Sequence, residues 1–230
     1  EDLNKIGEYV VDIGTFYYLI HQNKSDIFPL SGISNSKTIH CNENGYFTIY
    51  ESDRYGFNNP DYEWDKKEIE YLLTGDSFIH GNCVNRPHEI ASVLRSLSNK
   101  GVLNLGYEHA RGPLSEYASL REYLGPNVKK VIWFFYGNDL DDLNLELKNV
   151  ILNNYLEDIN FSQSLKYKQN EINNYAKLII DIEQNKLQDK LSNDTKIKNK
   201  KPTGEFIKFL KIDATRRNIK KNLPNKFKLL

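Results

Sequence analysis

The feature that most constrains the fold is an alternation of apolar runs and helical patterns between residues 67 and 140. Three apolar runs are rich in strand-forming residues: Ile69–Leu73, Gly101–Leu105 and Val128–Tyr136. The third contains the continuous sequence VIWFF at residues 131–135, which is typical of a strand buried on both faces. We therefore expect the aromatic side chains of residues 133–136 to lie in the core around this strand rather than to form a binding surface for a ligand.

Two helical patterns separate the three runs. Apolar residues of the first pattern repeat at i, i+3, i+4 and i+7, at Ile90, Val93, Leu94 and Leu97. The second pattern repeats nearly as well, and Pro113 occupies the position of a first-turn proline. A strand-helix-strand-helix-strand order at these lengths predicts a parallel sheet with right-handed crossovers. We therefore expect an α/β fold, flavodoxin-like and mostly parallel, with helices on both faces.

The rest of the chain divides by composition into flanking segments. Residues 1–66 are expected to form an N-terminal extension that packs on the core, residues 67–191 a partial α/β core, and residues 192–230 a basic linker with a C-terminal helix. Within these segments we expect helices over Leu3–Gln22, Leu140–Ile151, Leu165–Leu187 and from Phe206. We also expect short strands or an irregular hairpin between Cys41 and Phe57, and a Lys/Asn-rich linker or disordered loop over 192–204.

Charge and composition exclude several classes of partner. The 31 basic and 31 acidic residues cancel, which argues against nucleic acid or an anionic membrane surface as the main partner. The balance is uneven, because fourteen Lys/Arg and four Asp/Glu follow from Lys186 onward, and we read this tail as a solvated basic helix. The two cysteines form no Cys/His cluster, so no metal is expected. Cys41 and Cys83 are either a disulfide or two free thiols.

The start of the chain leaves its localisation open. No stretch approaches the roughly 20 apolar residues of a membrane span. The chain begins at Glu1 and contains no Met, so we expect that it does not begin at the natural start, and an upstream signal or membrane anchor stays open. A bacterial periplasmic or membrane-anchored protein is one option, and the oligomeric state is undetermined.

Polar, glycine-bearing turns follow all three apolar runs. They are TGDSFIHG at 74–81, GYEHARG at 106–112 and GND at 137–139. The carboxyl ends of parallel strands line one crevice, so we expect these turns to converge on one site. A serine at a strand end, Ser77, suits nucleophilic chemistry, and the amide of Asn138 can donate to a developing oxyanion without titrating. Taken alone, Ser77 reads as a helix N-cap; together with Asn138 it favours a nucleophile.

The same three turns resemble the conserved blocks of the SGNH/GDSL serine hydrolases. Gly75-Asp76-Ser77 resembles the GDS(L) nucleophile block, and Gly137-Asn138-Asp139 resembles the GxND block. Residues 104–106 (NLG) resemble the start of the block that supplies a glycine oxyanion donor. The resemblance covers roughly residues 40–155. This region resembles bacterial SGNH/GDSL proteins that are often linked to surface polysaccharides.

The resemblance implies a role for each matching residue. Ser77 would attack an ester carbonyl, and its own N–H, the Asn138 amide and a second-block N–H would form the oxyanion hole. Gly106 is the candidate for that second-block donor, with Gly112 as the alternative. Asp76 would orient the turn. The implied substrate is a small O-acyl group, such as an acetyl group on a carbohydrate, transferred to water or to another acceptor, with no cofactor.

One family block is missing from the sequence. No DxxH motif, which supplies the family's general base, occurs in the chain, so we expect a chain truncated before that block and inactive without it. His80 is a candidate substitute base, with a surface or loop histidine as the default interpretation, and His109 is a candidate substrate contact. For Asp139 a helix N-cap is favoured over a functional role. Arg111 is expected to pair locally rather than with a substrate carboxylate.

Two other classes of function compete with the enzyme. A non-catalytic binding protein would keep the same crevice without the base. A Rossmann-like nucleotide-binding domain would need a GxGxxG loop after the first strand, and residues 75–81 (GDSFIHG) lack that pattern.

Overall fold

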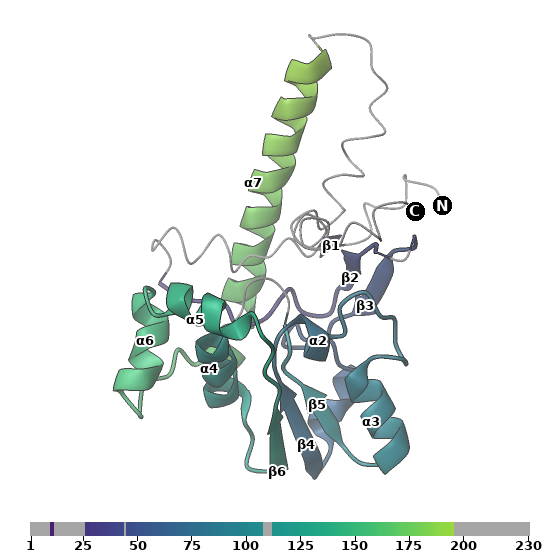
Figure 1. Cartoon of the computed structure of the whole chain (residues 1–230), viewed down its shortest axis with the longest axis vertical. Coiled ribbons are helices and arrows are strands. Elements are labelled where there is room, and N and C mark those ends of the chain that lie inside the picture. The colour runs from purple at the N-terminus through teal and green to yellow at the C-terminus, as the bar shows by residue number, and fades with distance from the viewer. Residues whose placement is uncertain (1–9, 12–25, 44, 108–111, 196–230) are drawn as a thin grey trace, which may run out of the picture.

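A computed structural model describes residues 10–11, 26–43, 45–107 and 112–195 of the chain (Figure 1). Its centre is a three-stranded parallel sheet formed by β4 (Ile69–Thr74), β5 (Val102–Asn104) and β6 (Val128–Trp133). The strand order is β5-β4-β6, so the first strand of the three along the chain lies in the middle. The α/β class predicted from the alternating pattern is confirmed.

Helices cover both faces of this sheet. Figure 1 shows α3 (Ile90–Ser98) on one side of the strands and α4 (Pro113–Tyr123) on the other. The short helix α2 (Ser77–His80) follows β4 directly, at the carboxyl end of the sheet. The N-terminal end of α4 has no capping side chain of its own. Instead the buried carboxylate of Glu146 accepts hydrogen bonds from the N–H groups of Gly112, Leu114 and Ser115 at 2.8, 3.0 and 3.2 Å.

A second small sheet precedes the core. It has the order β1-β2-β3, with β1 (Val10–Val11) parallel to β2 (Lys37–Cys41), and β2 antiparallel to β3 (Thr48–Glu51). A hairpin is present, but its strands lie earlier than predicted: among the described residues of 41–46 only Cys41 belongs to a strand, and none of residues 53–57 does. The helix predicted over Leu3–Gln22 is wrong at Val10–Val11, which are extended, and its other residues lie outside the described part of the chain.

The main core joins the N-terminal segment to the sheet and helices. Phe28, Leu30 and Phe57 pack in one cluster with strand residues such as Leu72 and with Tyr123 of α4. The Phe57 and Tyr123 rings are perpendicular, with centroids 4.8 Å apart. A short 3-10 helix, η2 (Asp61–Asp65), leads from this segment towards β4. The N-terminal segment from residue 26 onward is therefore part of the packed core.

The chain after β6 differs from the sequence prediction. The single helix expected over Leu140–Ile151 is two helices, α5 (Asp139–Glu146) and α6 (Val150–Glu157). The break lies at Asn149, whose side chain accepts a hydrogen bond from Leu152 N at 3.1 Å and so begins α6. After the 3-10 helix η3 (Leu165–Tyr167), α7 runs over Gln169–Thr195. Residues 192–195 of the expected linker are therefore helical, and the rest of that linker lies outside the described residues.

The third strand is shorter and more exposed than predicted. It ends at Trp133, and the side chains of Val131, Phe135 and Tyr136 are 43%, 63% and 60% exposed. Among the described strands, β6 pairs only with β4 and so forms an edge of the sheet. The prediction of a strand buried on both faces, with the aromatic run in its core, is wrong. In the part of the chain that the structure describes, no helix has the length and apolar character needed to cross a membrane.

Candidate active site

Ser77 is the first residue of α2, immediately after the turn that ends the central strand. Asp76 is the N-cap of this helix, and its carboxylate accepts a hydrogen bond from Phe78 N at 3.0 Å. Ser77 therefore does not serve as the cap. Its side chain is half-buried and makes no hydrogen bond to any described residue. The N-cap interpretation of Ser77 is thus wrong, and Asp76 orients the turn.

Asn138 and Asp139 follow the neighbouring strand β6. Asn138 is exposed, and its amide donates to the Asp142 carboxylate at 3.3 Å, a contact that a substrate can replace. Asp139 is 1% exposed, and its Oδ2 accepts a hydrogen bond from Tyr136 N at 2.6 Å, which closes the turn. The helix N-cap expected at Asp139 is instead Asn138, and Asp139 is the first residue of α5.

The turns after β4 and β6 lie next to each other. Phe134 N donates to Thr74 O at 3.0 Å, which extends the pairing of the two strands to the point where both turns begin. Beyond it, the rings of Phe78 and Tyr136 are 4.8 Å apart and are 57% and 60% exposed. The chain passes from β4 to β5 on one side and then to β6 on the other, so the order of the strands changes direction between β4 and β6. Ligands bind at such a point in open α/β sheets.

Both glycines considered as the second oxyanion donor already use their N–H groups. Gly106 N donates to the Asn104 side chain at 2.8 Å, and Gly112 N donates to Glu146 at 2.8 Å. A Cβ on Gly106 would lie 2.5 Å from His80 N, so this turn packs directly on the backbone of α2. His109 and Arg111 lie outside the described residues, so their contacts stay predictions.

His80 is buried rather than on the surface. Its side chain is 0% exposed, and its ring stacks on His40 with centroids 4.4 Å apart. Tyr50 and Tyr107 complete this interior group of rings, with centroids 5.1 and 5.7 Å from that of His80. The default interpretation of a surface or loop histidine is wrong. An imidazole packed in this way would have to leave its cluster to serve Ser77 as a base.

Cys41 and Cys83 form a disulfide, so of the two interpretations the pair of free thiols is wrong. The bond ties the end of β2 to the segment directly after α2. The described residues offer one group with metal-ligating atoms close together, Cys41, Glu43 and Cys83, and its two sulfurs are bonded to each other.

Buried carboxylates surround the two turns on the α4 and α5 side. Glu116 of α4 is 1% exposed and accepts a hydrogen bond from the Trp133 indole at 2.5 Å. Burial raises the pKa of Glu116 to about 8, and the nearby charges of Asp139 and Asp76 act in the same direction. Burial also raises the pKa of Asp76, with contributions from Asp139 and Asp142. Sequence reasoning missed Glu116, because α4 carries several polar residues and nothing in their spacing marks which of them is buried.

Comparison with known proteins assigns no family to the chain. No family model matches it, and neither a curated protein nor a solved structure does.

Proposed function

We propose that the chain is an SGNH/GDSL-type serine esterase or acyltransferase that acts on small O-acyl groups, with Ser77 as its nucleophile. The observation that carries this proposal is the arrangement of Ser77 and Asn138 at adjacent strand ends. Ser77 begins a helix that Asp76 caps, so its hydroxyl is left for chemistry. The strand order, with the first strand between the second and third, is that of flavodoxin-like sheets and agrees with the proposed fold.

The proposed reaction begins with attack of Ser77 Oγ on the ester carbonyl. A bond forms between Oγ and the carbonyl carbon, and the carbonyl oxygen becomes an oxyanion. The N–H of Ser77, which as a first-turn N–H has no partner inside the helix, and the exposed amide of Asn138 would donate to that oxyanion. The alcohol of the ester leaves, and water or another hydroxyl then takes the acyl group from Ser77.

The hydroxyl proton needs a base that the described residues do not supply. The resemblance assigns this role to the histidine of a DxxH block, which the sequence lacks. Among the histidines that the structure describes, the rings of His40 and His80 are packed in the interior, and His88 is on an exposed loop. We therefore expect weak or no Ser77-dependent turnover unless a residue outside the described part of the chain supplies the base.

The surroundings of the site favour an apolar or flat substrate group. The exposed rings of Phe78 and Tyr136 lie beside the two turns that carry Ser77 and Asn138. An acetyl group or the apolar face of a sugar ring would pack against such rings. This agrees with an acylated carbohydrate as the substrate.

A non-catalytic binding protein is the second candidate function. Two observations favour it: the interior position of His80, and the engagement of the Gly106 and Gly112 N–H groups by other side chains. Such a protein would bind an acylated sugar at the same strand ends without cleaving it.

Hydrolysis assays separate the two functions. We would measure release of acetate from p-nitrophenyl acetate and from acetylated sugars, using the chain and any longer form encoded by its gene. Ser77→Ala tests the nucleophile, and Ser96→Ala, which changes an exposed serine on α3, is the matched control. Turnover that Ser77→Ala abolishes and Ser96→Ala retains supports the enzyme. Binding of acetylated sugars without Ser77-dependent turnover supports the second candidate instead.

A further inference from the structure

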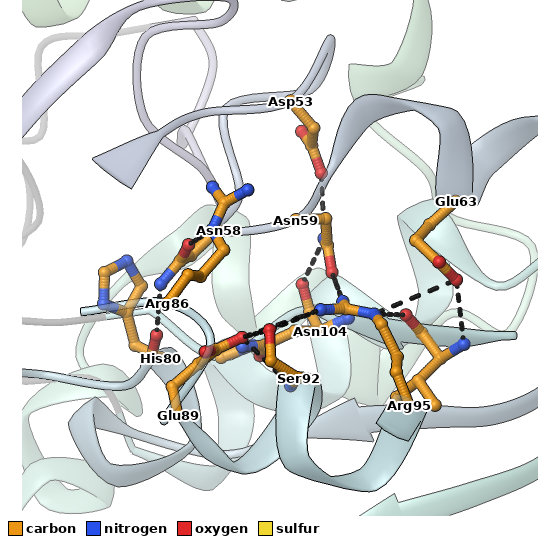
Figure 2. A network of polar contacts seen from close by, with 12 residues as sticks. Asp53, Asn58, Asn59, Glu63, His80, Arg86, Glu89, Ser92, Arg95 and Asn104 are labelled. Carbon is orange, nitrogen blue, oxygen red and sulfur yellow. Dashed lines mark hydrogen bonds and ion pairs between the residues drawn. The ribbon is translucent and has the colours of Figure 1, made fainter. Parts of the chain in front are cut away.

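The helix that carries Ser77 is held in place by side chains from outside it. It has four residues, far fewer than a helix needs for stability on its own. Carbonyls at the end of a helix have no partner within it. Here Ile79 O accepts a hydrogen bond from the Asn104 amide at 2.7 Å, and His80 O accepts one from the Asn58 amide at 2.9 Å. Figure 2 shows Asn58 pointing to His80.

Asn104 also fixes the turn that follows β5. It is the last residue of that strand, is 0% exposed, and its Oδ1 accepts a hydrogen bond from Gly106 N at 2.8 Å. The turn at Gly106 contacts the backbone of α2, because a Cβ there would meet Ile79 C at 2.7 Å. One side-chain amide therefore joins the first and second polar turns and sets the spacing between them.

The orientation of Asn104 is itself set by a buried polar network (Figure 2). Asn59 accepts a hydrogen bond from Asn104 N at 2.8 Å and donates one to Asn104 O at 2.9 Å. Asn59 in turn donates to Asp53 at 2.8 Å and accepts from Arg95 at 2.7 Å. All four polar atoms of Asn104 are thus bonded, and its amide group can take only one of its two flipped orientations.

From this geometry we propose that Asn104 is a positioning residue for Ser77. Its amide holds α2 against the turn at Gly106, so that Ser77 keeps a fixed place relative to the second turn and to Asn138. Because Asn59 and Asp53 hold Asn104, the N-terminal segment also helps to fix the position of the turn that carries Ser77. The effect on turnover rests on the proposed function, whereas the effect on the position of α2 does not.

The test compares Asn104→Asp with a matched control, Asn127→Asp. Asn104→Asp keeps the acceptor for Gly106 and replaces the donor to Ile79 O with a second oxygen. Asn127 also donates its amide to a backbone carbonyl, Lys66 O at 3.0 Å, but at the opposite end of the sheet. The first measurement is hydrogen exchange of the amides of residues 80–82, which are bonded within the α2 turn.

We expect these amides to exchange about tenfold faster in Asn104→Asp than in the parent chain, as the loss of one hydrogen bond would give, and to be unchanged in Asn127→Asp. The second measurement is Ser77-dependent turnover, where we expect kcat to fall by about tenfold to a hundredfold with KM within about twofold. If Asn104→Asp does not fold, Asn104→Ser removes the same donor without adding a charge.

The inference is overturned if exchange in residues 80–82 is unchanged, or rises equally in Asn127→Asp. It is also overturned if exchange rises while kcat stays at the parent value. If neither this chain nor any longer form encoded by its gene shows Ser77-dependent turnover, the proposed function fails, and the exchange measurement alone decides whether Asn104 positions α2.

Discussion

Removal of the disulfide between Cys41 and Cys83 should have a large effect on stability. The bond closes a loop with a sequence separation of 42 between the end of β2 and the segment after α2. Closing a loop of this length lowers the entropy of the unfolded chain by roughly 13 cal/mol/K, or about 4 kcal/mol at 25 °C. Because whole domains are stable by only about 5–15 kcal/mol, this is a substantial part of the total.

Urea unfolding followed by tryptophan fluorescence measures this contribution. The double variant Cys41→Ala/Cys83→Ala should lose about 4 kcal/mol of unfolding free energy relative to the oxidised parent. A reductant should destabilise the parent by a similar amount and leave the double variant unchanged, which serves as the control. A loss below about 1 kcal/mol, or two titratable thiols in the untreated parent, would refute the reasoning.

Three further predictions concern buried groups near the site. Burial raises the pKa of Glu116 from its usual 4.5 to about 8 in the folded protein, so its contribution to stability is present below pH 4.5 and is lost as the pH rises through 8. The unfolding free energy of the parent should therefore fall between pH 5 and pH 9 by more than that of Glu116→Gln, and an equal fall in both proteins would contradict the assignment. Glu146→Ala removes the cap of α4 and should lower the unfolding free energy measured in urea by about 3 kcal/mol. The control Asp141→Ala changes an exposed residue and should lower it by less than about 0.5 kcal/mol, and equal effects of the two changes would argue against the cap. Gly106→Ala places a Cβ 2.5 Å from the α2 backbone and should lower the unfolding free energy by about 2–3 kcal/mol. Gly137→Ala is the control, because a Cβ at Gly137 would meet no atom within 4 Å, and a neutral Gly106→Ala would show that the two turns can separate.

The sequence predicts the central α/β unit because local and long-range signals agree there. The apolar run at residues 69–73 becomes β4, and the helical spacing from Ile90 to Leu97 becomes α3. Polar turns after parallel strands must gather at one edge, so the proximity of the turns after β4 and β6 follows from topology alone.

Other features depend on contacts that are distant in the sequence. The exposure of β6 depends on which strands pair with it, which a run of apolar residues does not specify. The burial of His80 depends on the β2–β3 hairpin, which supplies His40 and Tyr50.

The role of Asn104 was missed for a similar reason. A polar residue at the end of an apolar run reads as the start of a turn. Its function as a bridge depends on Ile79 and Gly106, which only the fold brings to it. By contrast the disulfide was one of two alternatives that the sequence left open, and the Cα–Cα distance of 5.0 Å agrees with a bond.

The most direct test of the central claim is to identify the residue that an acylating or phosphonylating probe modifies. The chain, and any longer form encoded by its gene, would be treated with a fluorophosphonate and digested, and the modified peptide would be mapped by mass spectrometry. The account predicts a single adduct on Ser77, absent from Ser77→Ala and formed about a hundredfold or more slowly in Asn138→Ala, as the loss of an oxyanion donor would give. An adduct on another residue, or none on Ser77 in any form, would contradict it.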